Sequence, residues 1–311
     1  MLKQLLEIYE LLDSPRASGE AVAALLTARG LDAVEVQPVA GEAGKTDFVK
    51  VLVPGAAGKS AGGQAPTLGI IGRLGGIGAR PAVRGMVSDA DGALAALTCA
   101  LKLADMRRQG EVLAGDVRIA THICPAAPIR PHDPVPFMMS PVEMAVMNRY
   151  EVDAAMEAIL SVDATKGNRI LNRRGIAITP TVKEGYILRV AEDLLTILQQ
   201  VTGQLPVVLP LTTQDITPYG NGLYHLNSIV QPAVATDAPV VGVATTAEVP
   251  VAGCATGANQ LEDVAAAARF CLEVAKAFGE GRCQFYDAEE FARLVRRYGS
   301  MKHLQTLGQE A

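Results

Sequence analysis

The chain has 311 residues, of which 49% are hydrophobic and 20% are charged, and its formal net charge is −5. This composition is typical of a globular protein with a substantial core, and the absence of a basic block longer than an arginine pair argues against nucleic-acid binding. No uninterrupted apolar run reaches the roughly 18 residues that a membrane helix needs, so we expect no membrane span.

Apolar periodicity and turn signals divide the chain into helices and strands. In chain order we predict helices at 1–13 and 19–29, strands at 33–39, 48–53 and 67–71, a helix at 93–106, strands at 116–121 and 158–162, a helix at 188–200, a strand at 239–245 and a helix at 261–278. Gly30 is expected to close the second helix, and Pro38 is expected to mark a sheet edge. The glycine-rich residues 72–85 are predicted to be an exposed connection, and the proline-rich residues 125–136 an extended loop.

The alternation of strands with helices predicts a parallel or mixed sheet with helices on its faces. Because no repeat or linker is visible, residues 1–311 are expected to form a single α/β domain with a mixed, mostly parallel sheet and helices on both faces. A free sheet edge would be a surface for self-association, so a homo-oligomer is one expected state.

Five cysteines stand at irregular spacing, without the close pairs that hold structural zinc. This pattern favours a reducing compartment, and we predict a cytoplasmic protein. Cys99 and Cys271 lie in apolar helical runs and are predicted to fill the core.

Residues 55–60 read GAAGKS and end like a phosphate-binding P-loop. However, Val53 stands where the motif requires glycine, and no helical pattern follows. We therefore expect no nucleotide site here.

Four polar clusters follow predicted strands or precede predicted helices, which is where ligands bind in open α/β sheets. Their members are Asp89 with Asp91, His122 with Cys124, Asp163 with Lys166, and Asp215 with His225. Carboxylate, imidazole and thiolate groups are metal ligands, so each cluster could belong to a metal or ligand site. A purely structural role is equally open for these residues. Aspartates cap helices, and the segment from 212 to 225 has the composition of a solvated loop.

The segment VSDADGALAALTCALKLA resembles the bridging-aspartate segment of co-catalytic zinc exopeptidases, the group of aminopeptidases, carboxypeptidases and deacylases. The resemblance places Asp89 in the bridging-ligand position. The strand AILSVD resembles the strand that ends in a later carboxylate ligand, here Asp163. This resemblance implies a zinc-exopeptidase-like α/β fold. It also implies that the ancestral chemistry was the hydrolysis of peptide-like amides at a two-metal site.

The other ligands that this resemblance implies are missing. The family's histidine-x-aspartate motif would fall near Arg73, its paired glutamates near Cys124, and its final histidine near Gly253. An arginine beside a metal position opposes the binding of a dication, and without the glutamate the activation of water lacks its base. The ordinary peptidase mechanism is therefore not expected.

Two kinds of site are left open. One is a site for a single divalent metal, zinc or manganese, held by Asp89, Asp163, His122 and Cys124. The other is a metal-free pocket for a small-molecule ligand, in which Arg73 and Lys166 would bind an anion and Asp91, Asp215 and His225 would add polar contacts.

Longer motifs carry a second resemblance, which covers most of the chain. THICPAAPIRPHDP, SVDATKGNR, PTVKEGY and TQDITPYGNG resemble a bacterial and archaeal family known as domain of unknown function 1177. That family implies no activity, substrate or cofactor. The sequence therefore favours a non-catalytic or divergent small-molecule-binding protein; the alternative is a metal-dependent hydrolase of small amides or peptide-like substrates built around Asp89 and Asp163.

Overall fold

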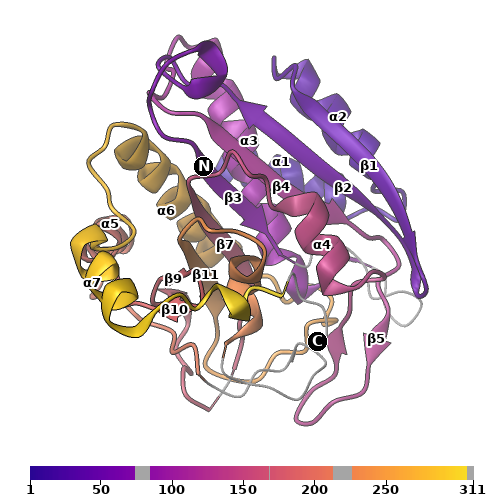
Figure 1. Cartoon of the computed structure of the whole chain (residues 1–311). Coiled ribbons are helices and arrows are strands. Elements are labelled where there is room, and N and C mark those ends of the chain that lie inside the picture. Colours follow the sequence, from indigo (N-terminus) through magenta and orange to yellow (C-terminus); the bar gives the residue numbers. More distant parts are fainter. Residues whose placement is uncertain (74–84, 168, 213–225, 307–311) are drawn as a thin grey trace.

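The computed structural model describes residues 1–73, 85–167, 169–212 and 226–306, and it is organised around one nine-stranded sheet (Figure 1). The strand order is β1-β2-β4-β3-β7-β11-β9-β10, with β8 paired to β11. The strands are β1 Val34–Gly41, β2 Gly44–Val53, β3 Leu68–Gly72, β4 Val117–Ile123, β7 Ala158–Ala164, β8 Gly175–Ile178, β9 Val182–Lys183, β10 Tyr186–Ile187 and β11 Val240–Thr246. A separate short hairpin is formed by β5 Ile129–Arg130 and β6 Phe137–Met138.

The centre of the sheet is parallel. Strands β4, β3, β7 and β11 run in the same direction, so their carboxyl ends meet at one edge, which we call the carboxyl edge. Antiparallel strands flank this core on both sides, and β1 is the outermost strand on the β2 side. Pro38 lies in β1, as predicted for a sheet edge, and the expected mixed sheet with a parallel core is confirmed.

Helices cover both faces of the sheet (Figure 1). They are α1 Leu2–Leu12, α2 Gly19–Ala28, α3 Asp91–Arg108, α4 Met144–Glu151, α5 Glu192–Thr202, α6 Leu261–Gly279 and α7 Ala288–Tyr298, with 3-10 turns η1 Lys59–Ala61, η2 Ser88–Ala90, η3 Ser228–Val234 and η4 Lys302–Leu304. Helices α1, α2, α3 and α6 pack on one face, whereas α4 and η3 cover the other. None of the helices in the described ranges is long and apolar enough to cross a membrane.

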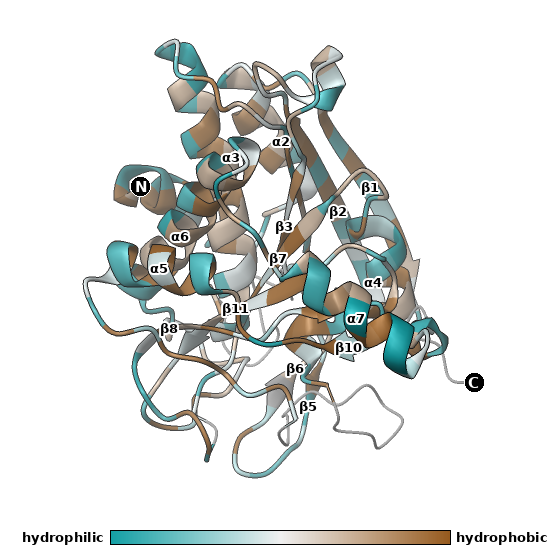
Figure 2. Cartoon of the chain, turned by 60° about the vertical axis from the view of Figure 1, so that its left-hand side comes forward, coloured by the Kyte–Doolittle hydropathy of each residue, from teal (hydrophilic) through white to brown (hydrophobic). Residues whose placement is uncertain are grey.

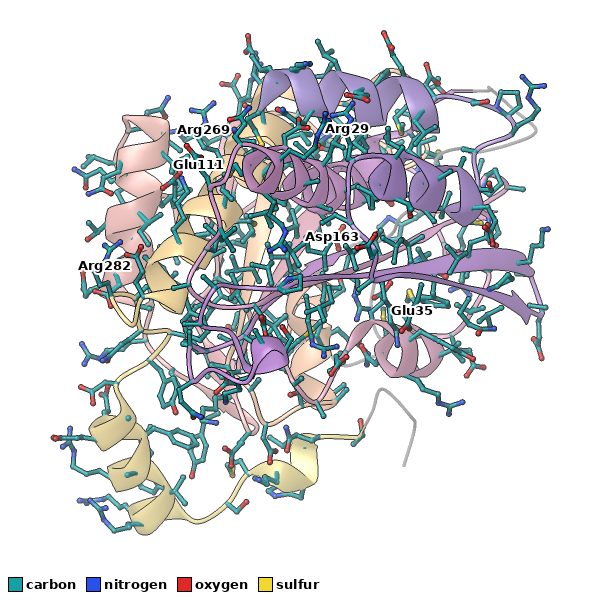
Figure 3. All side chains as sticks on the ribbon, turned by 90° about the horizontal axis from the view of Figure 1, so that it is seen from above. Arg29, Glu35, Glu111, Asp163, Arg269 and Arg282 are labelled. Carbon is teal, nitrogen blue, oxygen red and sulfur yellow. The ribbon has the colours of Figure 1, made fainter. Side chains whose placement is uncertain are left out.

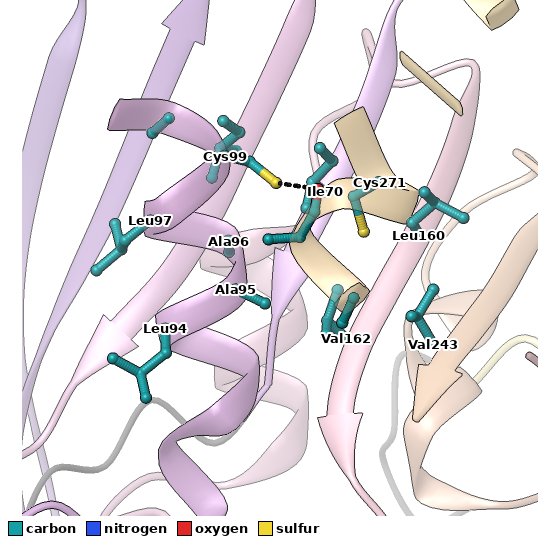
Figure 4. Packing of buried hydrophobic residues seen from close by; sticks show 14 of the residues in the cluster. Ile70, Leu94, Ala95, Ala96, Leu97, Cys99, Leu160, Val162, Val243 and Cys271 are labelled. Carbon is teal, nitrogen blue, oxygen red and sulfur yellow. Dashed lines mark hydrogen bonds between the residues drawn. The ribbon is translucent and has the colours of Figure 1, made fainter. Parts of the chain in front are cut away.

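The main core lies between the sheet and the layer formed by α3 and α6 (Figure 4). Ile70, Leu160 and Val243 extend into it from three neighbouring strands and are fully buried. Cys99 and Cys271 lie in the same layer with no exposed surface, so their predicted core role is confirmed. Hydrophilic residues gather instead on outer helices such as α5 and α7 (Figure 2).

Most predicted elements are confirmed, including the end of α2 at Gly30, whose φ is 90°. The helix predicted at 188–200 instead begins at Glu192, because the N–H of Leu188 donates to the carbonyl of Thr181 at 2.8 Å and Ala191 is an extended N-cap. The prediction left out helices α4 and α7, strands β8, β9 and β10, and the β5–β6 hairpin.

The glycine-rich connection after β3 also needs a correction. It was expected to be exposed, but its first side chain, Arg73, is only 2% exposed. Residues 74–84 lie outside the described residues.

The GAAGKS loop encloses a carboxylate of the same chain. Asp116, just before β4, accepts hydrogen bonds from the backbone N–H groups of Gly55 and Ser60, both at 2.8 Å, and from the Ser60 hydroxyl at 2.7 Å. Gly58 passes so close that a Cβ atom there would lie 1.9 Å from Asp116 Oδ1. Burial alone would raise the pKa of Asp116, but these hydrogen bonds outweigh it and hold the pKa below its ordinary value.

This arrangement predicts a pH-dependent loss of stability in an Asp116→Asn variant. Because the folded-state pKa is lowered, the carboxylate stabilises the fold above the ordinary pKa of about 4, and this contribution disappears as the pH falls toward the lowered value. We expect a cost of about 1.5–3 kcal/mol at pH 7, as for hydrogen bonds to a charged group. Urea unfolding at pH 7 and pH 3 should show the difference from wild type shrinking at pH 3. A pH-independent difference would contradict this, and the exposed Asp32→Asn serves as control.

Candidate functional site

The carboxyl edge is also where α3 begins. The N–H of Arg73, directly after β3, donates to the carbonyl of Val162 on β7 at 2.8 Å. In the first turn of α3, a Cβ atom on Gly92 would lie 2.3 Å from the Val162 oxygen and 2.5 Å from the Arg73 oxygen. Only glycine therefore lets the start of α3 rest directly on the strand ends.

A buried charged group lies on the α4 side of this edge; we call Arg73, His122, Asn148 and Glu151 the Glu151 cluster. Oε1 of Glu151 lies 2.6 Å from His122 Nδ1, and Oε2 lies 2.9 Å from Arg73 Nε. The second contact is an ion pair whose N–H is not aligned as a hydrogen bond. Arg73 also donates through Nη2 to Asn148 Oδ1 at 2.7 Å, and all four residues are at most 2% exposed. One carboxylate thus balances the Arg73 charge and orients the His122 ring.

A second group, buried except for the half-buried Asn259, surrounds the start of α3; we call Asp91, Lys166, Thr245 and Asn259 the Asp91 cluster. Oδ2 of Asp91 lies 2.7 Å from Lys166 Nζ and accepts a hydrogen bond from the Thr245 hydroxyl at 2.8 Å. Oδ1 accepts a hydrogen bond from Asn259 Nδ2 at 2.7 Å. The N-cap of α3 is Ala90, and no side chain caps the helix there. Asp91, in the first turn, is the buried ion-pair partner of Lys166.

Asp89 and Asp163, the two aspartates assigned by resemblance, lie in neighbouring elements. Asp89 is in η2, which packs against β7, the strand that carries Asp163. The two residues are 9% and 6% exposed. Figure 3 places Asp163 in the interior, in contrast to charged residues at the periphery such as Arg282.

His122 and Cys124 are poorly suited to join these aspartates as metal ligands. His122 Nδ1 faces Glu151, and the Cys124 thiol donates to the Lys45 carbonyl at 3.5 Å. Burial raises the pKa of Cys124 to about 11, which disfavours the thiolate form that binds metals. Within the described ranges, no group of three or more His, Cys, Asp or Glu side chains is placed to hold a metal ion. The structure thus does not bring the four predicted ligands together, and Asp215 and His225 lie outside the described residues.

Four residues that were not predicted complete the two clusters: Asn148, Glu151, Thr245 and Asn259. A signal existed for the first two, because Met144, Met147 and Tyr150 repeat at the spacing of one helical face. Thr245 ends the strand predicted at 239–245, a position of the kind that marked the other polar clusters, whereas no local pattern marks Asn259.

Comparison with solved structures gives the class of fold. A mutant of tomato leucine aminopeptidase matches with a TM-score of 0.51 and 12% identity, over 87% of this chain and 61% of that chain. This chain thus spans about three fifths of the length of the tomato enzyme. The LapA aminopeptidase of Legionella pneumophila matches with a TM-score of 0.45 and 9% identity, over 92% of this chain and 70% of that chain. Glutaminyl cyclase from Macrostomum lignano matches with a TM-score of 0.48 and 8% identity, over 91% and 90%. The match to the tomato enzyme shows that the protein has an aminopeptidase-like α/β fold.

Sequence comparison gives the family. The profile of the family described as protein of unknown function (DUF1177) matches residues 37–308, so the chain belongs to this family. No curated protein matches the sequence. The fold is thus shared with peptidases, whereas the family carries no assigned activity.

Proposed function

We propose that this protein binds a small molecule at the carboxyl edge and does not use the two-metal chemistry that its resemblance to zinc exopeptidases implies. The Glu151 cluster is the observation that supports this. Arg73 stands where the resemblance expects a histidine ligand, and Glu151 fixes its charge in the interior. Arginine has only N–H donors and cannot replace a histidine ligand, and the nearby carboxylate is already engaged by Arg73 and His122 and does not act as a base for water.

The two clusters also limit the kind of ligand that fits. Arg73 is paired with Glu151, and Lys166 is paired with Asp91, and both cations are at most 4% exposed. An anionic ligand would have to compete with these internal carboxylates. A neutral or cationic ligand therefore suits the edge better than the anion that the sequence analysis considered.

The alternative function is a metal-dependent hydrolase of small amides or peptide-like substrates. One observation favours it: Asp89 and Asp163 lie in adjacent elements at the carboxyl edge, and carboxylates are ligands for zinc and manganese. In that case the metal site would be rebuilt around these two aspartates.

Metal analysis of protein purified without a chelator distinguishes the metal-free binding protein from the metal-dependent hydrolase. We expect less than stoichiometric zinc and manganese in wild type, and no change in metal content in Asp89→Ala or Asp163→Ala. Asp32→Ala, an exposed aspartate, is the matched control. Stoichiometric metal that is lost in either site variant but kept in the control would overturn the metal-free proposal and favour the hydrolase.

Three further properties are proposed on more general grounds. A single domain is supported by the one sheet, which contains strands from Val34 to Thr246. A cytoplasmic location is supported by five free cysteines. Self-association is proposed at β1, because the described strands leave its outer edge without a neighbour.

A further inference from the structure

A cavity of about 200 Å³ lies between the end of α5, the start of α6 and the segment that leads into β8. It is lined in part by the apolar residues Ile176 and Val207. Three arginines also line it: Arg173 and Arg174, directly before β8, and Arg269 on α6 (Figure 3). The cavity therefore combines an apolar wall with an unusual number of guanidinium groups.

Carboxylates already balance one of these arginines. Arg174 Nη2 lies 3.0 Å from Glu262 Oε2, and Arg174 Nε lies 3.2 Å from Asp263 Oδ2, both in the first turn of α6. The Glu262 side chain is 84% exposed, so water screens much of its charge. Burial raises the pKa of Asp263, although Arg174 acts in the opposite direction. The described lining has three arginines and two carboxylates, which leaves a formal charge of +1.

The other two arginines form no ion pair with any described residue. Arg173 donates through Nη2 to Gln204 Oε1 at 2.8 Å, and Arg269 donates through Nη1 to the Val201 carbonyl at 3.4 Å. Both acceptors line the cavity, so both guanidinium groups lie at its wall. A guanidinium group has five N–H donors, and one hydrogen bond leaves most of them for a ligand.

The end of α5 opposes an anion less than a free helix terminus would. The negative partial charge of a helix C-terminus lies on carbonyls that have no partner in the helix. Here the Gln199 carbonyl accepts a hydrogen bond from the N–H of Gly203 at 2.9 Å, and the Val201 carbonyl accepts the one from Arg269. These donors offset part of the helix dipole at the cavity.

We propose that this cavity binds a small organic anion, with its carboxylate or phosphate oxygens held by Arg173 and Arg269 and its apolar part against Ile176 and Val207. The planar guanidinium fork matches both kinds of oxyanion. The volume of about 200 Å³ is roughly that of six or seven water molecules in the liquid, so the ligand is small. None of the described lining residues belongs to the Glu151 or Asp91 cluster, and this site does not depend on the proposed function.

The test is the unfolding temperature of the full chain at pH 7 and constant ionic strength. Millimolar butyrate or monoethyl phosphate replaces part of the chloride, and the low concentration avoids the general stabilisation that phosphate-like salts give to proteins. Binding to the folded state should raise the unfolding temperature in a saturable way. A rise with butyrate identifies a carboxylate site, and a rise with monoethyl phosphate alone identifies a phosphoryl site.

Two variants remove one guanidinium group each, Arg173→Gln and Arg269→Gln. Each should weaken the apparent affinity for the anion about tenfold, the effect of losing one hydrogen bond to a charged group. Arg282→Gln is the matched control, because Arg282 is also exposed but pairs with Glu280 and does not line the cavity. In chloride alone, all three variants should unfold close to the wild-type temperature, since surface substitutions change stability little.

The proposal is wrong if neither anion raises the unfolding temperature of wild type. It is also wrong if the Arg173 and Arg269 variants respond to the anions as the Arg282 variant does. Neither result would affect the small-molecule proposal for the carboxyl edge, which is tested by metal content.

Discussion

Replacing Glu151 with leucine should lower the free energy of unfolding by about 3–5 kcal/mol, the usual cost of leaving a buried charge without its partner. The variant leaves Arg73 in the interior without a carboxylate and releases Nδ1 of His122. Urea unfolding at pH 7, followed by circular dichroism, measures the effect. The large value is expected because Glu151 is only 1% exposed.

Two further variants show whether the loss comes from the unpaired charge. Glu289→Leu removes a glutamate that is 90% exposed and lies 3.7 Å from Arg293, so little change in stability is expected. The double variant Arg73→Met with Glu151→Leu should recover part of the loss, because it removes the buried charge together with its partner. If the single Glu151 variant were as stable as wild type, the ion pair described here would be wrong.

The variant Gly92→Ala should be destabilised by about 2–3 kcal/mol, the upper part of the range of about 1–3 kcal/mol found when extra volume is forced into a packed interior. Helix propensity alone predicts the opposite sign, since alanine is favoured over glycine in a helix by about 1 kcal/mol. The steric clash should outweigh the gain in helix propensity, because the new Cβ atom would lie 2.3 Å from the backbone oxygen of Val162 and 2.5 Å from that of Arg73. Neither is the end of a flexible side chain, so the start of α3 would have to move.

The same unfolding measurement checks this prediction. Lys102→Ala, on the same helix with a partly buried side chain, should change stability by no more than about 0.5 kcal/mol. A Gly92→Ala variant more stable than wild type would show that α3 does not rest on the strand ends as described. The same movement would displace Asp91, the preceding residue, from Lys166 and Thr245.

The strands and long helices could be predicted because their signals are local. The helix around Cys99 and the strand that contains Leu160 have continuous apolar runs, and both are found where predicted. Helix α4 was missed because it is short, although one apolar face marks it, and its partners lie on β2 and β4. The start of α5 was wrong because Leu188 is still held by a backbone hydrogen bond to Thr181, which no local pattern indicates.

The candidate site could be predicted only in part, for a related reason. His122, Asp91 and Lys166 were identified from their positions at element ends and Arg73 from the resemblance to zinc exopeptidases, but their roles depend on partners that were not predicted. Arg73 was expected to bind an anionic ligand, but it forms an internal ion pair with Glu151. Lys166 likewise pairs with Asp91. Pairings of this kind depend on three-dimensional approach, so single-chain patterns do not reveal them.

The loop around Asp116 has a consequence for how glycine-rich motifs are interpreted. In phosphate-binding loops, backbone N–H groups surround an anion that arrives with a nucleotide. Here the anion is a side chain of the same polypeptide, and the loop lysine, Lys59, pairs with Glu157 at 2.7 Å. The occupant is tethered, so it is present at any solute concentration and does not exchange. The GAAGKS loop is therefore permanently occupied, because the Asp116 carboxylate takes the place that the phosphate has in a nucleotide-binding loop.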